Sequence, residues 1–267
     1  MLQKINSHQN PKFKSAVRLQ TARGRKLQSR FLIHGTREVS RALGSKSLEP
    51  AELFLCEQLL DEATLNEFVA LAVARRAPIY TVPVDLITKI AYGETASGAV
   101  LVAHRPDTNL TDETQITGGV LVVEAIEKPG NLGAVIRSAD GAGLSAVVSA
   151  NPVTDLFHPN CIRSSLGTCL TMPCFTGESR SLRDWLVNRG FQILAARVDG
   201  ATDYDRVHFE SNIAIVLGSE ANGLSDDWNH PSITNISLPM LGVADSLNIS
   251  ATAAILSYEY RRQRREV

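Results

Sequence analysis

The second half of the chain alternates short apolar runs with longer segments in which apolar residues recur at helical spacing. The apolar runs lie at 120–123, 146–149, 193–196, 213–217 and 236–238. Helical spacing covers 132–142, 158–167 and 182–188, and a long final segment at 246–261. Strands that are separated by helices usually pair in parallel, with helices covering both faces of the sheet. The pattern therefore predicts an α/β domain built on a mostly parallel sheet.

The first half of the chain shows a smaller version of the same alternation. A strand beginning at Arg30 turns at Gly35 into a helix, and further strands are predicted at 53–56, 79–82 and 99–103. Helices are predicted at 61–76 and 84–91, and a polar, threonine-rich stretch follows the last strand. We therefore predict a small α/β domain at 1–106, a linker at 107–117 and a larger α/β domain at 118–267.

The charge of the chain is unevenly distributed. Apolar residues make up 44% of the 267 residues and charged residues 21%, which are globular values, and the net charge is −1. Residues 1–41 nevertheless contain ten Lys or Arg and one acid, Glu38. Such an excess is typical of a surface that binds a polyanion such as RNA, although a solvated terminal tail is the alternative. The candidate RNA-binding residues in this segment are Lys12, Lys14, Arg18, Arg23, Arg25 and Lys26.

The compartment is indicated by what the chain lacks. No apolar run approaches the about 18 residues needed to span a bilayer, and residues 1–11 contain no apolar signal-peptide core. The cysteines near His158 follow one another at spacings of eight and five residues, which match no common zinc pattern. We expect the cysteines to be buried thiols, no metal site, and a cytoplasmic protein.

Polar loops follow three of the predicted strands. They read PGNLGAVIRSADGAG after the strand at 120–123, VLGSEANGL around the end of the strand at 213–217, and LPMLGVADSLNIS after the strand at 236–238. In the third loop Ser246 occupies the position of a helix N-cap. Helical spacing predicts that the final helix buries one apolar stripe: Leu247, Ala251, Ala254, Ile255 and Tyr258.

In this order and at these separations, the three loops resemble the motifs of the SpoU family, within the SPOUT superfamily. The resemblance covers residues 118–262. It implies an S-adenosylmethionine-dependent RNA ribose 2′-O-methyltransferase with a trefoil-knotted α/β fold. The segments RFLIHGTREVSRAL and SGAVLVAH further resemble the ribosomal-protein-like substrate-binding domain that often precedes SpoU catalytic domains.

The resemblance also implies which side chains form the catalytic site. Asn131 and Arg137 come from the first motif, Glu220 from the second, and Ser246 and Asn248 from the third. The family's proposed base is the arginine of the first motif, here Arg137. A guanidinium keeps its proton to a pH above about 12, so it is better suited to gripping a phosphate or stabilising alkoxide charge. Both roles stay open for Arg137, and Glu220 either holds Asn131 and Arg137 in place or is an ordinary acid of the loop.

The cofactor is expected among the second and third motifs. The resemblance places S-adenosylmethionine against Gly218, Leu238 and Leu247, and we expect Leu217 and Met240 to form walls of the same pocket. Glycine allows close backbone approach, and the leucines supply apolar surface for the adenine and the thioether. Arg163 is a further candidate for RNA contact, or else a cation on a solvated helix face.

The function hypothesis is 2′-O-methylation of structured RNA, with 23S ribosomal RNA favoured by the separate N-terminal domain. A transfer-RNA methyltransferase and a non-catalytic RNA-binding protein of the same fold are the alternatives, and a small-molecule α/β enzyme is a third. We also expect a homodimer through the catalytic half, because the apolar set of the final helix is too wide to be covered by one sheet face. That set is Leu247, Ile249, Ala251, Ala253, Ala254, Ile255, Leu256 and Tyr258.

Overall fold

The computed structural model describes residues 2–93, 97–199 and 202–264. The chain divides into two compact units. The N-terminal unit comprises Met1–Asp107 together with Phe157–Thr171, and the C-terminal unit comprises Thr108–Leu156 together with Met172–Val267. No helix in the described ranges is both long and apolar enough to cross a bilayer.

The N-terminal unit is built on a five-stranded mixed sheet in the order β1-β4-β3-β5-β2. β1, β4 and β3 pair in parallel, and β5 runs antiparallel to both β3 and β2. All four strands predicted here are present, and β1 is an additional short strand at the edge. The strands are β1 Leu2–Lys4, β2 Arg30–His34, β3 Pro50–Leu55, β4 Ile79–Thr81 and β5 Ala99–His104.

Helices cover this sheet, and two of them belong to the basic leading segment. The helices are α1 Pro11–Arg18, α2 Ala22–Gln28, α3 Thr36–Gly44, α4 Glu62–Ala74, α5 Val84–Ile90 and α7 Pro159–Ser164. The side chain of Asn10 caps α1 by accepting from the N–H groups of Lys12 and Phe13, and Pro11 occupies the first helical position. Thr21 caps α2 in the same way.

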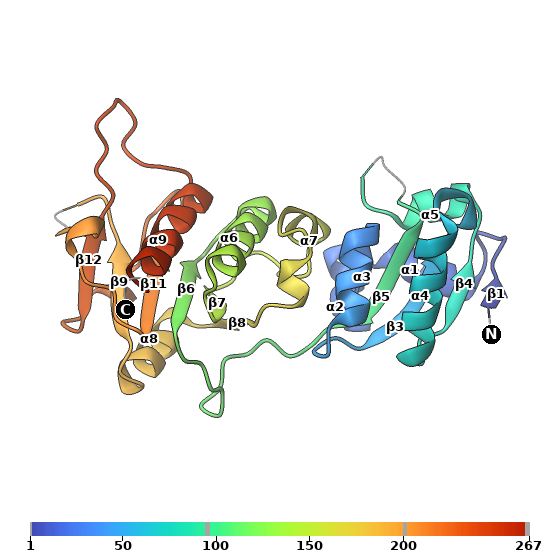
Figure 1. The fold of residues 1–267 in the computed structure, drawn as a ribbon, viewed down its shortest axis with the longest axis horizontal. Helices are drawn as coiled ribbons and strands as arrows, with labels where there is room; N and C mark the ends of the chain where they lie inside the picture. The colour runs from blue at the N-terminus through green and yellow to red at the C-terminus, as the bar shows by residue number, and fades with distance from the viewer. Residues whose placement is uncertain (1, 94–96, 200–201, 265–267) are drawn as a thin grey trace. The chain divides into compact units, whose positions relative to one another are not determined.

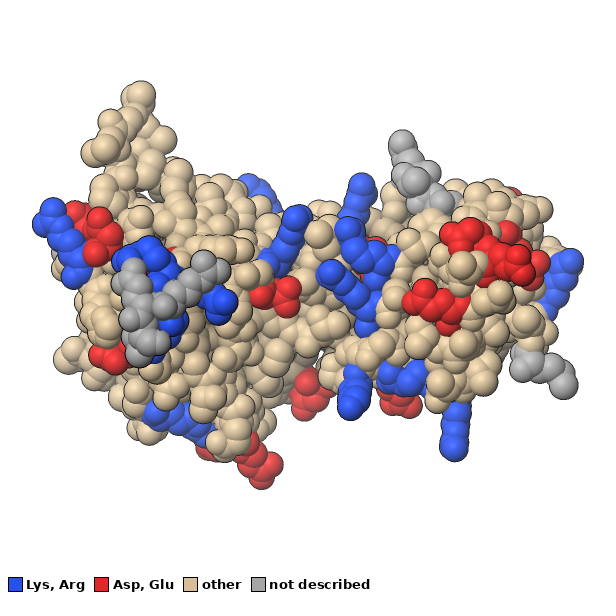
Figure 2. Space-filling model, viewed as in Figure 1, with Lys and Arg blue, Asp and Glu red and all other residues tan. Residues whose placement is uncertain are grey.

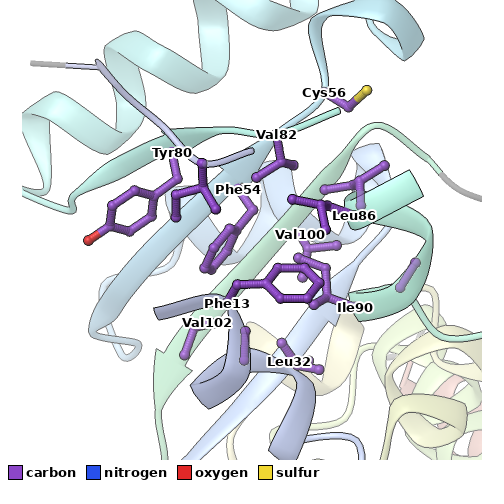
Figure 3. Close-up of a cluster of buried hydrophobic side chains, with 14 of the residues drawn as sticks. Phe13, Leu32, Phe54, Cys56, Tyr80, Val82, Leu86, Ile90, Val100 and Val102 are labelled. Carbon is purple, nitrogen blue, oxygen red and sulfur yellow. The ribbon is translucent and has the colours of Figure 1, made fainter. Parts of the chain in front are cut away.

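Phe13 anchors the leading segment in the hydrophobic core of the N-terminal unit. Its ring lies close to Ile90 and Val100, among the buried side chains drawn in Figure 3. Phe54 and Val102 belong to the same cluster. The interpretation of this segment as a solvated tail is therefore wrong, since its first helix packs onto the sheet.

The C-terminal unit contains a seven-stranded sheet in the order β10-β12-β9-β11-β6-β7-β8. Every pair of neighbours in it is parallel, which confirms the predicted sheet type. The two outermost strands, β8 and β10, are short, and the sequence pattern did not reveal them. The strands are β6 Gly119–Glu124, β7 Ala146–Ala150, β8 Cys174–Gly177, β9 Gln192–Ala196, β10 Thr202–Asp203, β11 Ile213–Leu217 and β12 Ile233–Ser237.

In the described part of this unit, three α-helices accompany the sheet: α6 Pro129–Ala142, α8 Ser179–Asn188 and α9 Ile249–Arg264. α6 and α9 lie side by side (Figure 1). α6 begins earlier than predicted, because Pro129 opens it at the first helical position; Arg137 therefore lies in the third helical turn rather than the second. The segment predicted as a helix at 158–167 forms only the short α7, which belongs to the N-terminal unit.

The final helix buries a different face from the one predicted. Ile249, Ala253, Leu256 and Tyr260 face the core. In contrast, Leu247 is 41% exposed, Ile255 36% and Tyr258 54%. The predicted buried stripe is therefore wrong. α9 is apolar on two faces, and spacing alone does not tell which of them packs within the same chain.

The four cysteines are free thiols, of which Cys56, Cys161 and Cys169 are buried and Cys174 is partly exposed. Part of the segment predicted as a linker runs along the C-terminal unit. The backbone N–H of Leu110 donates to Thr176, and the indole N–H of Trp185 donates to the carbonyl of Thr111.

Candidate active site and cofactor pocket

One carboxylate gathers side chains from all three polar loops. Oε1 of Glu220 accepts a hydrogen bond from Nδ2 of Asn131 at 2.7 Å and another from Nδ2 of Asn248 at 2.8 Å. Oε2 accepts from Nζ of Lys128 at 2.8 Å. The structure thus places three of the five predicted catalytic residues in direct contact, although they are far apart along the chain.

Helix ends position the partners of Glu220. Asn131 lies in the first turn of α6, directly after Pro129 and Gly130. Asn248 immediately precedes α9, and its Oδ1 accepts from the N–H of Ser250 at 2.9 Å. The asparagine therefore caps the helix with its oxygen, which leaves its amide nitrogen free to reach Glu220.

Ser246 is not the N-cap that the sequence predicted. α9 starts at Ile249, two residues later than a Ser246 cap requires, and Asn248 makes the capping bond. Ser246 instead lies in the exposed loop before the helix and lines the pocket described below.

Lys128 is a member of the cluster that sequence reasoning missed. The hydrogen bond and the negative charge of Glu220 raise the pKa of Lys128 above its ordinary value. The available signal was its position immediately before Pro129 and Gly130, at the start of the first motif, where a cation lies beside the loop ends of neighbouring strands.

Arg137 stands apart from the Glu220 cluster. Its side chain is exposed on α6, and it makes no hydrogen bond or ion pair with any residue in the described ranges. The expectation that Glu220 holds Arg137 is therefore wrong, because Lys128 occupies Oε2. The guanidinium is left accessible for a molecule outside the chain.

A pocket of about 540 Å³ adjoins Glu220 at the carboxyl end of the parallel sheet. Leu217 ends β11 and pairs with Ala196, the last residue of β9, which in turn pairs with Ile236 of β12. Loops leaving these three strands form the walls, as is usual for ligand sites in parallel α/β sheets. All five residues predicted to contact the cofactor line this pocket: Leu217, Gly218, Leu238, Met240 and Leu247.

Gly218 is required by the shape of its own loop. A Cβ atom at this position would lie 2.2 Å from the carbonyl carbon of Gly223. Ser219 and Gly223 exchange two backbone hydrogen bonds of 3.0 Å, which fold the loop back over Gly218. The absence of a side chain at Gly218 therefore lets the backbone of Gly223 approach it closely. The resulting turn carries Glu220.

The far end of this loop is anchored by a buried carboxylate. Glu124, at the end of β6, accepts from the backbone N–H of Ser225 at 2.8 Å and from its hydroxyl at 2.7 Å. The hydroxyl of Ser179 also donates to Glu124. The second motif is thus held at both ends, so Glu220 is presented from a fixed loop.

The loop between β12 and α9, residues 238–248, projects away from the sheet (Figure 1). Leu241 and Val243 within it are fully exposed. The same loop contributes Leu238, Met240 and Leu247 to the pocket wall.

Three of the six candidate RNA-binding residues in the leading segment have partners within the protein: Lys12, Lys14, whose Nζ donates to the side chain of Gln9, and Arg25. Arg25 is only 2% exposed, and its Nη1 donates to the carbonyls of Leu19 and Gln20 at the end of α1. It is a structural cation, so its assignment to RNA contact is wrong. Nζ of Lys12 lies 2.9 Å from Oε1 of the buried Glu52, which raises the pKa of Lys12.

Apart from the buried Arg25 and from Lys12, which is paired with Glu52, four candidates have exposed side chains, and we call them the α1–α2 cations: Lys14, Arg18, Arg23 and Lys26. Arg163 is also exposed, on α7 of the same unit. Figure 2 shows positive and negative side chains interspersed over the viewed face of both units, rather than one continuous basic surface. The α1–α2 cations and Arg163 are therefore individual candidates for RNA contact.

The fold and the site define an α/β enzyme-type domain that holds its ligand at the carboxyl edge of a parallel sheet. Residues 119–258, just over half of the chain, match the SpoU rRNA Methylase family. The chain belongs to this family. Residues 10–101 match the MRM3-like substrate binding domain.

The similarity to known proteins extends over nearly the whole chain. The 23S rRNA (guanosine(2553)-2′-O)-methyltransferase RlmP of Bacillus subtilis (strain 168) is 28% identical over 97% of this chain and 100% of its own length. A crystal structure of an RNA 2′-O ribose methyltransferase is 33% identical, with a TM-score of 0.83, and covers 98% of this chain and 99% of its own. An AdoMet-bound rRNA methyltransferase from Sinorhizobium meliloti, 23% identical, shares the fold with a TM-score of 0.88 over 98% of each chain.

Proposed function

We propose that this protein transfers the methyl group of S-adenosylmethionine to a ribose 2′-hydroxyl in structured RNA, and that its substrate is 23S ribosomal RNA. The observation that carries the proposal is the Glu220 carboxylate, which joins Asn131 and Asn248 beside a pocket of ligand size. Membership of the SpoU family and the name of the B. subtilis relative support the choice of reaction and RNA.

The pocket residues fit this cofactor. Leu217, Leu238 and Leu247 offer apolar surface, and the loop folded over Gly218 brings backbone polar groups to the same wall. The volume of about 540 Å³ lies within the range of about 300–1,000 Å³ usual for small-molecule sites. S-adenosylmethionine supplies a methyl group that is already activated by its sulfonium, so the protein mainly has to orient donor and acceptor.

Asn131 and Asn248 are suited to orienting the acceptor ribose, since Glu220 fixes both amide groups. Arg137 is suited to contact RNA, because its guanidinium is exposed and unpaired among the described residues. We propose that it grips a phosphate or stabilises the charge that develops on the 2′-oxygen. Ser246, on the pocket wall, completes the site from the third motif.

The N-terminal region, residues 1–106, is proposed to position the RNA. The match of residues 10–101 to a substrate-binding domain and the exposed α1–α2 cations support this role. We propose residues 107–117 as the connection and 118–267 as the methyltransferase domain. The family resemblance further supports a trefoil knot in that domain and a cytoplasmic location.

A homodimer through the C-terminal unit is also proposed. Ile255 and Tyr258 expose apolar surface on α9, and Leu241, Val243 and Leu247 are exposed on the loop that precedes it. A broad apolar surface of this kind is what an obligate symmetric interface requires.

The test is methyl transfer by the purified full-length protein with methyl-tritiated S-adenosylmethionine. Transcripts of 23S rRNA and total tRNA are offered separately, with Glu220→Ala protein as the control. We expect label in 23S rRNA, recovered after nuclease digestion as a 2′-O-methyl nucleoside. Label in tRNA alone would replace the proposed substrate, and no label in either RNA would contradict the proposed reaction.

A further inference from the structure

The end of β9 places a cation against the pocket. Arg197 follows Ala196, the last residue of β9, and both line the pocket. The backbone N–H of Arg197 donates to the carbonyl of Ile236 at 2.8 Å, which ties the residue to β12. Its position is therefore set by the sheet rather than by a mobile loop.

The guanidinium of Arg197 is incompletely paired. Nη2 donates to Oδ1 of Asn229 at 2.7 Å, which is a neutral partner. Nε is buried and has no hydrogen-bond partner in the part of the chain that the structure describes. Nη1 makes no hydrogen bond, and no carboxylate lies within ion-pair distance, among residues 2–93, 97–199 and 202–264.

A partly buried guanidinium without an anion is unfavourable, because it has lost water and gained no opposite charge. An anion that enters the pocket would remove this cost. Two exposed acids, Asp199 and Asp245, line the same pocket. Glu220 also lines the pocket but is paired with Lys128, so one cation and two further carboxylates face a ligand, and they are complementary to one that carries both a carboxylate and positive charge.

We propose that Arg197 binds the α-carboxylate at the amino-acid end of S-adenosylmethionine. The inference rests on the proposed function and names the polar end of the cofactor site. Leu217, Leu238 and Leu247 provide apolar surface for the adenosine, and Arg197 is the cation among the described residues that line the pocket, which suits it to the carboxylate. A phosphate of RNA is the other anion that this side chain could bind, but Arg197 lines the pocket, which favours the small ligand.

The experiment compares two ligands by isothermal titration calorimetry on the full-length protein. S-adenosylhomocysteine has the amino-acid group, and 5′-methylthioadenosine has the adenosine and thioether without it. Arg197→Gln should weaken binding of S-adenosylhomocysteine by about 10- to 100-fold, since a charge-assisted hydrogen bond is lost. Binding of 5′-methylthioadenosine should change by less than about twofold, because that ligand carries no carboxylate.

Arg206→Gln is the matched control, since Arg206 is an exposed arginine of the same unit that pairs with Asp203 and does not line the pocket. Arg197→Lys should recover part of the affinity, because it restores the charge. Equal losses for both ligands, or no loss for either, would overturn the assignment. A loss of RNA affinity with unchanged S-adenosylhomocysteine binding would also overturn it. Failure of the unmodified protein to bind either ligand would instead refute the proposed function itself.

Discussion

Removal of the Glu220 carboxylate should lower the rate of methyl transfer far more than it lowers the stability of the fold. Glu220→Ala removes the acceptor for Asn131 and Asn248 together with the ion pair to Lys128. The Glu220 side chain is 35% exposed, so solvent replaces part of what is lost. The two amide hydrogen bonds are worth about 0.5–1.5 kcal/mol each, or about 1–3 kcal/mol together. That corresponds to a fall in Tm of about 3–9 °C for a domain of this size.

The effect on turnover should be much larger than the effect on stability. Without Glu220 the two amide groups are free to rotate, and misplacement of a positioning group by about 1 Å costs about 100-fold in rate. Glu220→Gln is the informative intermediate. Its amide oxygen can still accept from both asparagines, while its NH₂ group cannot accept from Lys128. We expect its kcat to fall by only about fivefold, because a hydrogen bond to a charged group is replaced by a neutral one.

The assay is steady-state methyl transfer with paired thermal melts, and Glu113→Ala serves as the control for an exposed acid outside the site. If Lys128 acts only through Glu220, Lys128→Met and Glu220→Gln will not be additive in the double variant. Glu220→Ala protein with kcat within threefold of the unmodified enzyme would refute the reasoning. A fall in Tm beyond about 15 °C would also refute it, because that is well above the estimate from two hydrogen bonds. Glu220 would then act mainly by stabilising the fold.

The remaining predictions concern other parts of the molecule. Arg137→Ala should abolish turnover and leave affinity for S-adenosylhomocysteine nearly intact; an equal loss of both would contradict an RNA-facing role. Replacing the four α1–α2 cations by glutamine should weaken the salt dependence of RNA binding. The slope of log affinity against log salt concentration, measured by filter binding, should fall by about one unit for each lost phosphate contact. An unchanged slope would place RNA recognition elsewhere. Ala254→Arg should give a monomer by light scattering with activity lost, and an active wild-type monomer of 29.0 kDa at micromolar concentration would rule out the dimer. Burial lowers the pKa of His34, so the folded state holds it neutral and loses stability as pH falls below about 6.5. His34→Gln should therefore reduce the loss of Tm between pH 7 and pH 5, and an unaltered pH profile would exclude His34 as its source.

Much of the architecture follows from local pattern. Alternating apolar runs and helical segments predict the parallel sheet, because strands joined by crossovers must run in the same direction. The same rule brings the loops after β6, β11 and β12 to one edge of the sheet. The choice of Asn131, Glu220 and Asn248, and of the pocket residues, came from the resemblance to the SpoU motifs, and the sheet rule explains why these loops meet.

Tertiary packing decided what the pattern left ambiguous. α9 is apolar on two faces, and only its position against α6 and the sheet shows that Leu256 is buried while Tyr258 is exposed. Arg25 and Arg23 look alike in the sequence, yet Arg25 is buried against the end of α1 and Arg23 is not. The partner of Lys128 is 92 residues away along the chain. Local spacing determines which elements form, because it depends on near neighbours; which face is buried and which charge is paired depend on distant residues, so only the folded structure determines them.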